Sequence, residues 1–181
     1  MQGIHNINQT TLLLNSALVA TDPQSLSLCR SLLQQDMGFF VSVYPKFEEW
    51  FDRKVVPGLI LGQRTILIEL RQEHVAGFLI VKDSPLEKKI CTLRVREEFQ
   101  DRGLGVRLFK RAFELLKTEE PLLSASQHQL PRFTRIFDYF GFRIEREYIG
   151  LYRPLISEFS FNGLLKYSGS SAESVDELRF G

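Results

Sequence analysis

Three runs of apolar and β-branched residues between positions 65 and 96 constrain the fold of this 181-residue chain more than any other feature. The runs cover 65–70, 75–81 and 90–96, and polar turns separate them. Short strands joined by short polar turns pair antiparallel with their neighbours in the sequence. The middle of the chain is therefore predicted to be a three-stranded antiparallel sheet.

The segments around this sheet predict helices and further strands. We expect helices to begin after Asp22-Pro23, after Pro45, after Gly105 and at Pro131. Additional strands are expected at about 8–20, at 122–126, at 142–153 and after 155. Gly141 is expected in the left-handed conformation that ends many helices. The predicted order is β-α-α-β-β-β-α-β-α-β-β, an α+β fold whose mixed, mostly antiparallel central sheet is flanked by helices.

The composition is that of one ordinary folded domain, with 44% apolar and 25% charged residues. The best apolar run, 76–81, is far shorter than the span that a membrane helix needs. With 23 Lys and Arg against 22 Asp and Glu, the net charge of +1 gives no global attraction to nucleic acid or to an anionic membrane surface. We expect a single domain over 1–167 and a flexible polar tail over 168–181.

The cysteines and the N-terminal segment bear on the cellular compartment. Two cysteines, Cys29 and Cys91, are too few for a disulfide framework, and with three scattered histidines they form no metal-ligand spacing. The apolar segment 12–20 lacks the basic residues that begin a secretion signal, because the first basic residue is Arg30. We therefore expect a cytoplasmic protein without a metal site.

The segment with the clearest chemistry is Gln100-Asp101-Arg102-Gly103-Leu104-Gly105, between a predicted strand and an amphipathic helix. Backbone N–H groups at a helix start point outward along the axis, and the helix dipole favours negative charge there. The two glycines let the backbone approach a phosphate without an intervening Cβ. Leu108 replaces the third glycine of a dinucleotide fingerprint, and no lysine follows as in a nucleoside triphosphate loop. The predicted ligand is an anion such as pyrophosphate.

This hexapeptide resembles the Q/R-x-x-G-x-G acyl-CoA pyrophosphate loop of the GCN5-related N-acetyltransferases, the GNAT family. The preceding segment 93–99 looks like the strand that leads into that loop, and the predicted element order is also that of the family. The resemblance is close over 65–154 and loose over 1–64. It implies an acyl-CoA N-acyltransferase fold, acetyl-CoA as the cofactor, and transfer of the acetyl group to a primary amine by direct attack on the thioester.

The resemblance also implies residue roles. The cofactor-binding residues would be Leu93, Val95, Gln100, Asp101, Arg102, Gly103, Leu104, Gly105 and Val106. In the family, the strand before the loop splays away from the next strand, which leaves backbone groups free at positions that correspond to Leu93 and Val95. The Val95 N–H is the candidate donor to the developing oxyanion. The open wedge would lie against 123–126.

A general acid is harder to assign. Phe137 stands where many family members carry a tyrosine, and 128–130 offers no clear counterpart of their usual asparagine. Tyr139 lies about 200° around the helix from Phe137, so that it does not simply substitute. Tyr148 and Tyr152 on the following predicted strand are the candidate proton donors, with water as the alternative.

For a general base, Glu97 and Glu98 end the strand that feeds the loop. A carboxylate there could accept the amine proton through a water molecule. The alternative is that both are solvated charges beside Arg94 and Arg96. His128, in a predicted loop, either faces the cleft or lies on the surface.

The acceptor and the partners stay open at this point. The acceptor could be a small amine, a protein amino group or an aminoacyl-tRNA, the last being the substrate of acetyltransferase toxins. Basic residues in 94–111 and 132–153 could extend a positive patch towards tRNA, although solvated faces are favoured in a chain of neutral charge. A degenerate acyl-CoA sensor or interaction module is the main alternative function. No membrane partner is expected, and an apolar last strand is compatible with a homodimer.

Aromatic residues gather between positions 39 and 51. In the family fold this region would cover the acceptor side of the cleft, so that some of them would shape a substrate pocket. Core packing is the expected role of Phe47, Trp50 and Phe51.

Overall fold

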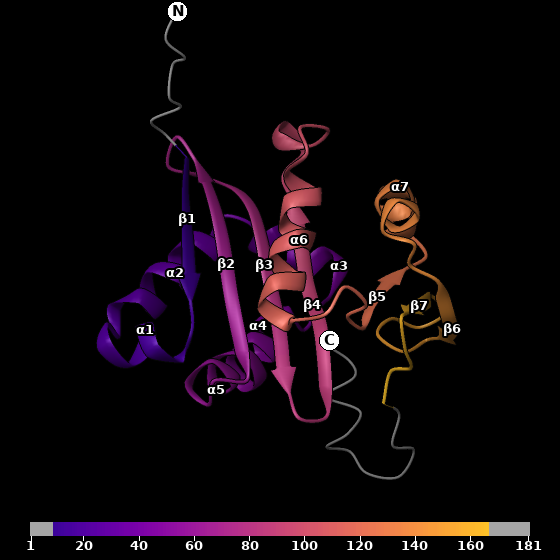
Figure 1. Ribbon diagram of the computed structural model, residues 1–181, viewed down its shortest axis with the longest axis horizontal. Helices are drawn as coiled ribbons and strands as arrows, with labels where there is room; N and C mark the ends of the chain where they lie inside the picture. Colours follow the sequence, from indigo (N-terminus) through magenta and orange to yellow (C-terminus); the bar gives the residue numbers. More distant parts are fainter. Residues whose placement is uncertain (1–8, 167–181) are drawn as a thin grey trace, which may run out of the picture.

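The computed structural model describes residues 9–166 (Figure 1). The predicted tail 168–181 lies outside the described residues. Four strands, β1 (Gln9–Leu14), β2 (Arg64–Arg71), β3 (His74–Ser84) and β4 (Glu87–Val95), form an antiparallel sheet in the order β1-β2-β3-β4. The three strands predicted in the middle of the chain are therefore confirmed as neighbours in one sheet.

A second, smaller sheet follows in the sequence. It consists of β5 (Leu123–Ser126), β6 (Ile144–Ile149) and β7 (Ser157–Phe161), in the order β5-β7-β6 with antiparallel pairing. One parallel bridge between Lys89 and Leu122 joins the two sheets. The prediction of a mixed, mostly antiparallel sheet flanked by helices is confirmed, with the difference that the sheet divides between β4 and β5.

The helices occupy both faces of the larger sheet (Figure 1). One face is covered by the short N-terminal elements α1 (Ser16–Thr21), α2 (Gln24–Gln34), α3 (Met37–Val43), α4 (Phe47–Trp50), a π-helical turn (Phe51–Val55) and α5 (Val56–Ile60). The other face carries α6 (Leu104–Leu116), which follows a 3₁₀ turn (Glu97–Phe99), and α7 (Leu130–Phe140) lies beside the smaller sheet. No helix within residues 9–166 is long and apolar enough to cross a membrane.

The alternation of side chains along the strands divides the core into two layers. On β2, Ile66 and Ile68 pack against the N-terminal helices, whereas Leu67 packs against the α6 layer. On β3, Phe78 and Leu79 face opposite layers in the same way. The sheet is therefore covered on both faces, which explains why the middle segments of its two central strands, 66–68 and 75–81, are continuously apolar.

Two predicted boundaries are wrong, and one helix was not predicted. The first strand ends at Leu14 rather than near 20, because the Asn15 side chain accepts a hydrogen bond from the Leu18 N–H at 3.0 Å and starts α1. The strand predicted to extend to 153 ends at Ile149, since Gly150 turns the chain with a φ of +74°. Helix α3 was not predicted. The left-handed Gly141 at the end of α7, with a φ of +70°, is confirmed.

Gly77 on β3 sets the distance between the sheet and α6. A Cβ atom at this position would lie 2.9 Å from Leu108 Cδ1 and 3.3 Å from Leu104 Cδ2, both on α6, and 3.3 Å from the Arg94 carbonyl oxygen. The first turn of α6 can therefore approach the sheet only because residue 77 has no side chain.

We expect Gly77→Ala to lower the free energy of unfolding by about 1–3 kcal/mol, because the methyl group overpacks the contact between α6 and β3. The measurement is the midpoint of urea unfolding. Gly38→Ala on α3 is the matched control, since nothing lies within 4 Å of the position of its Cβ. That change should be neutral or stabilising by up to about 1 kcal/mol. Equal midpoints for the two variants would contradict the assignment.

Candidate functional site

The site begins where β4 and β5 separate. At the bridge, the Ile90 N–H donates to the Leu122 carbonyl oxygen and the Leu122 N–H donates to the Lys88 carbonyl oxygen, both at 2.9 Å. Beyond this point the described residues form no further bridge between the two strands. The strands therefore leave a wedge whose one wall is the unpaired edge of β4.

The register of β3 and β4 identifies the backbone groups on that edge. The Arg96 N–H donates to the Ala76 carbonyl oxygen at 3.0 Å, and Gly77 lies opposite Val95. In an antiparallel ladder hydrogen-bonded and non-hydrogen-bonded pairs alternate, so the N–H and C=O groups of Val95 and of Leu93 point away from β3. These groups face the wedge.

One of these groups is already occupied. The Gln100 side-chain amide donates to the Val95 carbonyl oxygen at 3.0 Å. This bond ties the loop after β4 back to the strand end and leaves the Val95 N–H as the donor available at this position. Gln100 thus holds the loop in place in addition to lining the cavity described below.

The loop between β4 and α6 presents a helix start without a side-chain cap. Asp101 and Gly103 take positive φ values of +56° and +74°, and Gly103 is the N-cap of α6. The first hydrogen bond of the helix is donated by the Arg107 N–H to the Gly103 carbonyl oxygen at 3.1 Å, which leaves the preceding N–H groups of the first turn for a ligand. A Cβ at Gly105 would approach Ile136 Cδ1 at 3.5 Å, so a larger side chain there would enter the space between α6 and α7. This donor set fits phosphate oxygens.

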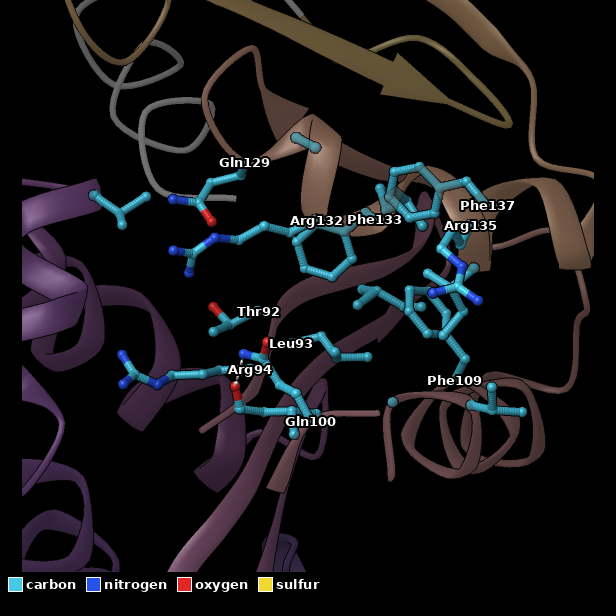
Figure 2. Close-up of a pocket in the computed structure, with 18 of the residues that line it drawn as sticks. Thr92, Leu93, Arg94, Gln100, Phe109, Gln129, Arg132, Phe133, Arg135 and Phe137 are labelled. Atoms are coloured by element: carbon cyan, nitrogen blue, oxygen red, sulfur yellow. Dashed lines mark hydrogen bonds between the residues drawn. The ribbon is translucent and has the colours of Figure 1, made fainter. Parts of the chain in front are cut away.

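A cavity of about 510 Å³ extends through the wedge, and Figure 2 shows the side chains around it. Its lining comes from β4, β5, the loop before α6, α6 itself, α7 and α3. On the α3 side the wall is aromatic, with Phe39, Phe40 and Tyr44. Cavities of this size accommodate small molecules, and several arginines bring positive charge to the walls: Arg94, Arg132 and Arg135.

Most of the predicted cofactor residues meet in this cavity. The lining includes Leu93, Val95, Gln100, Asp101, Gly103, Gly105 and Val106. Leu104 does not line it, because its side chain is buried against the sheet with 3% exposure. Arg102 is exposed and also lies outside the lining.

The predicted catalytic residues are more scattered. Glu97 and Glu98 are exposed on the 3₁₀ turn, and Glu97 forms an ion pair with Arg132 of α7 at 3.6 Å. The Tyr148 hydroxyl accepts a hydrogen bond from the Leu165 N–H at 3.0 Å. None of these three acidic or phenolic side chains lines the cavity.

Phe137 of α7 lines the cavity with a hydrocarbon ring. Its ring packs against Phe109, Phe133 and Phe161 at centroid distances of 6.1, 5.4 and 4.5 Å, and it is 4% exposed. The nearby Tyr139 also lines the cavity but is 65% exposed, as its position around α7 predicts. His128 is an exposed loop residue outside the lining. This side of the cavity is therefore hydrophobic.

Arg94 connects the cavity to α3. Its guanidinium lies 3.4 Å from the centroid of the Phe39 ring and forms an ion pair with Asp36 at 2.9 Å. Arg96 pairs with the other carboxylate oxygen of Asp36 at 2.9 Å. Asp36 is only 6% exposed, and the two ion pairs with arginine offset the free-energy cost of removing its carboxylate from water. Together these contacts fix α3 over the wedge.

Sequence reasoning missed a buried polar cluster on the same side as α3. Glu158 of β7 is 2% exposed, and it lies near Ser124 of β5, Tyr152 and Tyr44. Burial raises the pKa of Glu158 to about 7, although the Ser124 hydroxyl and the Lys89 ammonium lower it. Burial also raises the pKa of Tyr152 and of Tyr44 well above the ordinary value, so that both stay neutral.

The sequence contained one indication of this cluster. Segment 158–161 alternates polar and apolar residues, but three of its four side chains, the polar ones included, are buried in the structure. The polar half of an alternating strand normally faces water. The sequence therefore places Glu158 on the solvent-facing side of the strand. Only the tertiary structure shows that α3 and the 150–156 turn cover this side and bury the glutamate. Within the described residues no cluster of potential metal ligands occurs.

Comparisons with known proteins give a consistent structural result. No family model and no curated protein matches the sequence. Among solved structures, a Desulfovibrio desulfuricans protein assigned to the GNAT acetyltransferases superposes with a TM-score of 0.60 at 17% identity, covering 84% of this chain and 97% of its own.

Two further structures agree with it. A Salmonella typhimurium protein assigned to the acetyltransferases, solved with its cofactor acetyl-CoA, has a TM-score of 0.53 at 12% identity and covers 91% of this chain and 99% of its own. The IAA acetyltransferase from Bacillus cereus has a TM-score of 0.51 at 14% identity, with coverage of 84% and 97%. The antiparallel sheet, the split between β4 and β5, and these three superpositions show that the chain has the fold of the GNAT acetyltransferases.

Proposed function

We propose that this protein is an N-acetyltransferase that transfers the acetyl group of acetyl-CoA to a primary amine. The observation that supports this best is the wedge between β4 and β5, which ends at an uncapped helix start on one side and at an aromatic wall on the other. Such a passage accommodates an extended phosphate-bearing ligand and a second molecule that approaches from α3.

The residues that would hold the cofactor follow from the geometry of the loop. The backbone N–H groups after Gly103, in the first turn of α6, would bind the pyrophosphate oxygens, and the lack of a Cβ at Gly105 would give them access. The N–H and C=O groups at Leu93, and the Val95 N–H, would bind the arm that carries the thioester, in the manner of an added strand. Acetyl-CoA supplies an acetyl group activated as a thioester.

In the transfer step, the protein must orient an amine and stabilise negative charge on the carbonyl oxygen. The Val95 N–H serves as the donor to that oxygen, because Gln100 occupies the neighbouring carbonyl and keeps the strand end rigid. Apolar walls such as Phe109 and Phe133 exclude water, which strengthens this hydrogen bond. Phe137 cannot protonate the departing thiolate, so this proton would come from water or from Tyr148 or Tyr152.

The bases expected from the sequence, Glu97 and Glu98, are exposed beside the cavity. In this proposal they would take up a proton from an entering ammonium group through water. The acceptor in this proposal is a small amine or a protein amino group.

A second candidate function is favoured by one observation. Because the hydrocarbon ring of Phe137 fills the position where a proton donor is expected, the protein could bind acyl-CoA and sense it without transferring the acetyl group. Acetyl-CoA binding without transfer to any member of a panel of primary amines would support this alternative.

We expect Gly105→Glu to weaken acetyl-CoA binding by about tenfold or more, equivalent to about 1.4 kcal/mol, because it places a carboxylate at the anion site. A Cβ at residue 105 would meet no atom closer than 3.5 Å, so the variant should fold. Gln24→Glu adds the same charge on the exposed side of α2 and should bind normally. Calorimetric titration of acetyl-CoA measures both. Unchanged affinity in a folded Gly105→Glu protein would refute the proposed loop.

We expect Val95→Pro to lower kcat/KM by about 10²–10³-fold, because it deletes the proposed oxyanion donor. The ladder with β3 should survive, since this N–H points away from β3. Val95→Ala, which keeps the N–H, should stay near the wild-type rate. The assay follows release of the CoA thiol from acetyl-CoA with a panel of primary amines. Equal rates for the two variants would remove Val95 from the mechanism.

A further inference from the structure

Behind the α3 side of the cavity, polar residues from four separate segments converge. Ser124 of β5 and Tyr44 at the end of α3 line the cavity, and Tyr152 and Glu158 lie directly behind them. The rings of Tyr44 and Tyr152 meet edge to face with centroids 5.9 Å apart. These residues are brought together at the place where β4 and β5 diverge, although they are far apart in the sequence.

Three oxygen atoms of this cluster are buried without a partner. Within the described part of the chain, Ser124 Oγ, Tyr152 Oη and Glu158 Oε1 make no hydrogen bond of good geometry. Yet the Ser124 hydroxyl is close enough to both other groups to lower their pKa values. Buried polar atoms are nearly always hydrogen-bonded in proteins, and of these three residues Ser124 lines the cavity while Tyr152 and Glu158 lie behind it. The cluster therefore indicates a site for a polar ligand.

We propose that Ser124, Tyr152 and Glu158 form a subsite that receives the ammonium group of the acceptor and takes up its proton. This inference rests on the proposed function, because a transferase must deprotonate the amine before it attacks. It assigns that step to Glu158 in place of the exposed Glu97 and Glu98. Ser124 would contact the amine, since it lines the cavity, and Glu158 would hold the proton behind it. Tyr152, neutral because of its burial, would donate a hydrogen bond to the Glu158 carboxylate.

The proton transfer balances without any further reagent. One N–H bond of the ammonium group breaks and its electron pair stays on nitrogen, while the proton passes to Ser124 Oγ. At the same time the Ser124 O–H bond breaks and its proton bonds to a Glu158 carboxylate oxygen. The products are a neutral amine, an unchanged serine hydroxyl and a neutral carboxylic acid.

The wall around the subsite defines the chemical class of the acceptor. Phe39, Phe40, Val43 and Tyr44 present an almost entirely apolar surface from α3 and its C-terminal end. Phe40 is itself fixed by stacking on Phe47 at a centroid distance of 4.3 Å. A rigid aromatic wall next to a buried carboxylate suits a primary amine that is carried on an aromatic or aliphatic group.

The charged and titratable groups around Glu158 come from several elements. Lys89 of β4, Ser124 of β5 and the two tyrosines, Tyr44 and Tyr152, interact electrostatically with Glu158, and Cys91 of β4 does so with Tyr152. Lys89 is the cation near Glu158, and its charge lowers the pKa of that carboxyl. Because burial raises the pKa of Glu158 to about 7, the ionised fraction rises about tenfold between pH 6 and pH 8.

The test uses phenethylamine, an aromatic primary amine, and phenethyl alcohol, its uncharged analogue. Each is titrated calorimetrically into the full-length protein saturated with CoA, at pH 6 and at pH 8. We expect the amine to bind at least about tenfold more tightly than the alcohol at pH 8, and its own affinity to fall about tenfold at pH 6, where Glu158 is protonated.

Single substitutions distinguish the roles of Glu158 and Ser124. Glu158→Gln should lose both the preference for the amine and the pH dependence, while Ser124→Ala should weaken amine binding several-fold and keep the pH dependence. Glu145→Gln, on the exposed strand β6, is the matched control and should bind like the wild type. Circular dichroism establishes that each variant is folded.

Two outcomes would overturn the inference. One is an amine affinity in the wild type no higher than that of the alcohol, and the other is a folded Glu158→Gln variant with unchanged amine binding and pH dependence. Acetyl-CoA affinity is measured on the same preparations. If CoA binds throughout and the amine preference is absent, only the subsite falls; if CoA does not bind, the proposed function falls as well.

Discussion

The separation of β4 from β5 after a single bridge is the constraint on which the rest of the site depends. Two backbone hydrogen bonds at Lys88, Ile90 and Leu122 hold the sheets together at one end only. The remaining edge of β4 would be a liability if it were left open to water and to other chains. Here α6, α7 and α3 enclose it, so the unpaired edge becomes the wall of a cavity instead of an exposed surface.

The strands, α6 and the anion loop were predictable because their signals are local. Alternation or continuous apolar runs mark β2 to β4, and Gly103 and Gly105 stand directly before a helical period. The N-terminal boundaries were not predictable, since a side-chain cap at Asn15 and a π-helical turn at 51–55 decide them. Pro57 lies in the first turn of α5, directly after this π-helical turn.

The polar cluster around Glu158 could not be found from the sequence for a different reason. Its members come from the end of α3, β5, the 150–156 turn and β7, and each is unremarkable in its own segment. Only tertiary structure shows that a carboxylate, a serine and two tyrosines share one buried space. The ion pairs of Arg94 and Arg96 with Asp36 could not be predicted either, because they depend on where α3 crosses the end of β4. Sequence patterns thus predict the helices and strands well, but they do not show which side chains from distant segments meet in the folded protein.

The hydrogen bond from Gln100 to the Val95 carbonyl has a consequence for selectivity against polypeptides. A β-strand that added to the edge of β4 would need both an acceptor and a donor in alternation along its length. With the Val95 acceptor already engaged, the strand end offers only an N–H, which suits a ligand with isolated carbonyl groups and disfavours an extended peptide backbone. At the end of an edge that the helices already enclose, the glutamine thus adds a second obstacle to strand pairing.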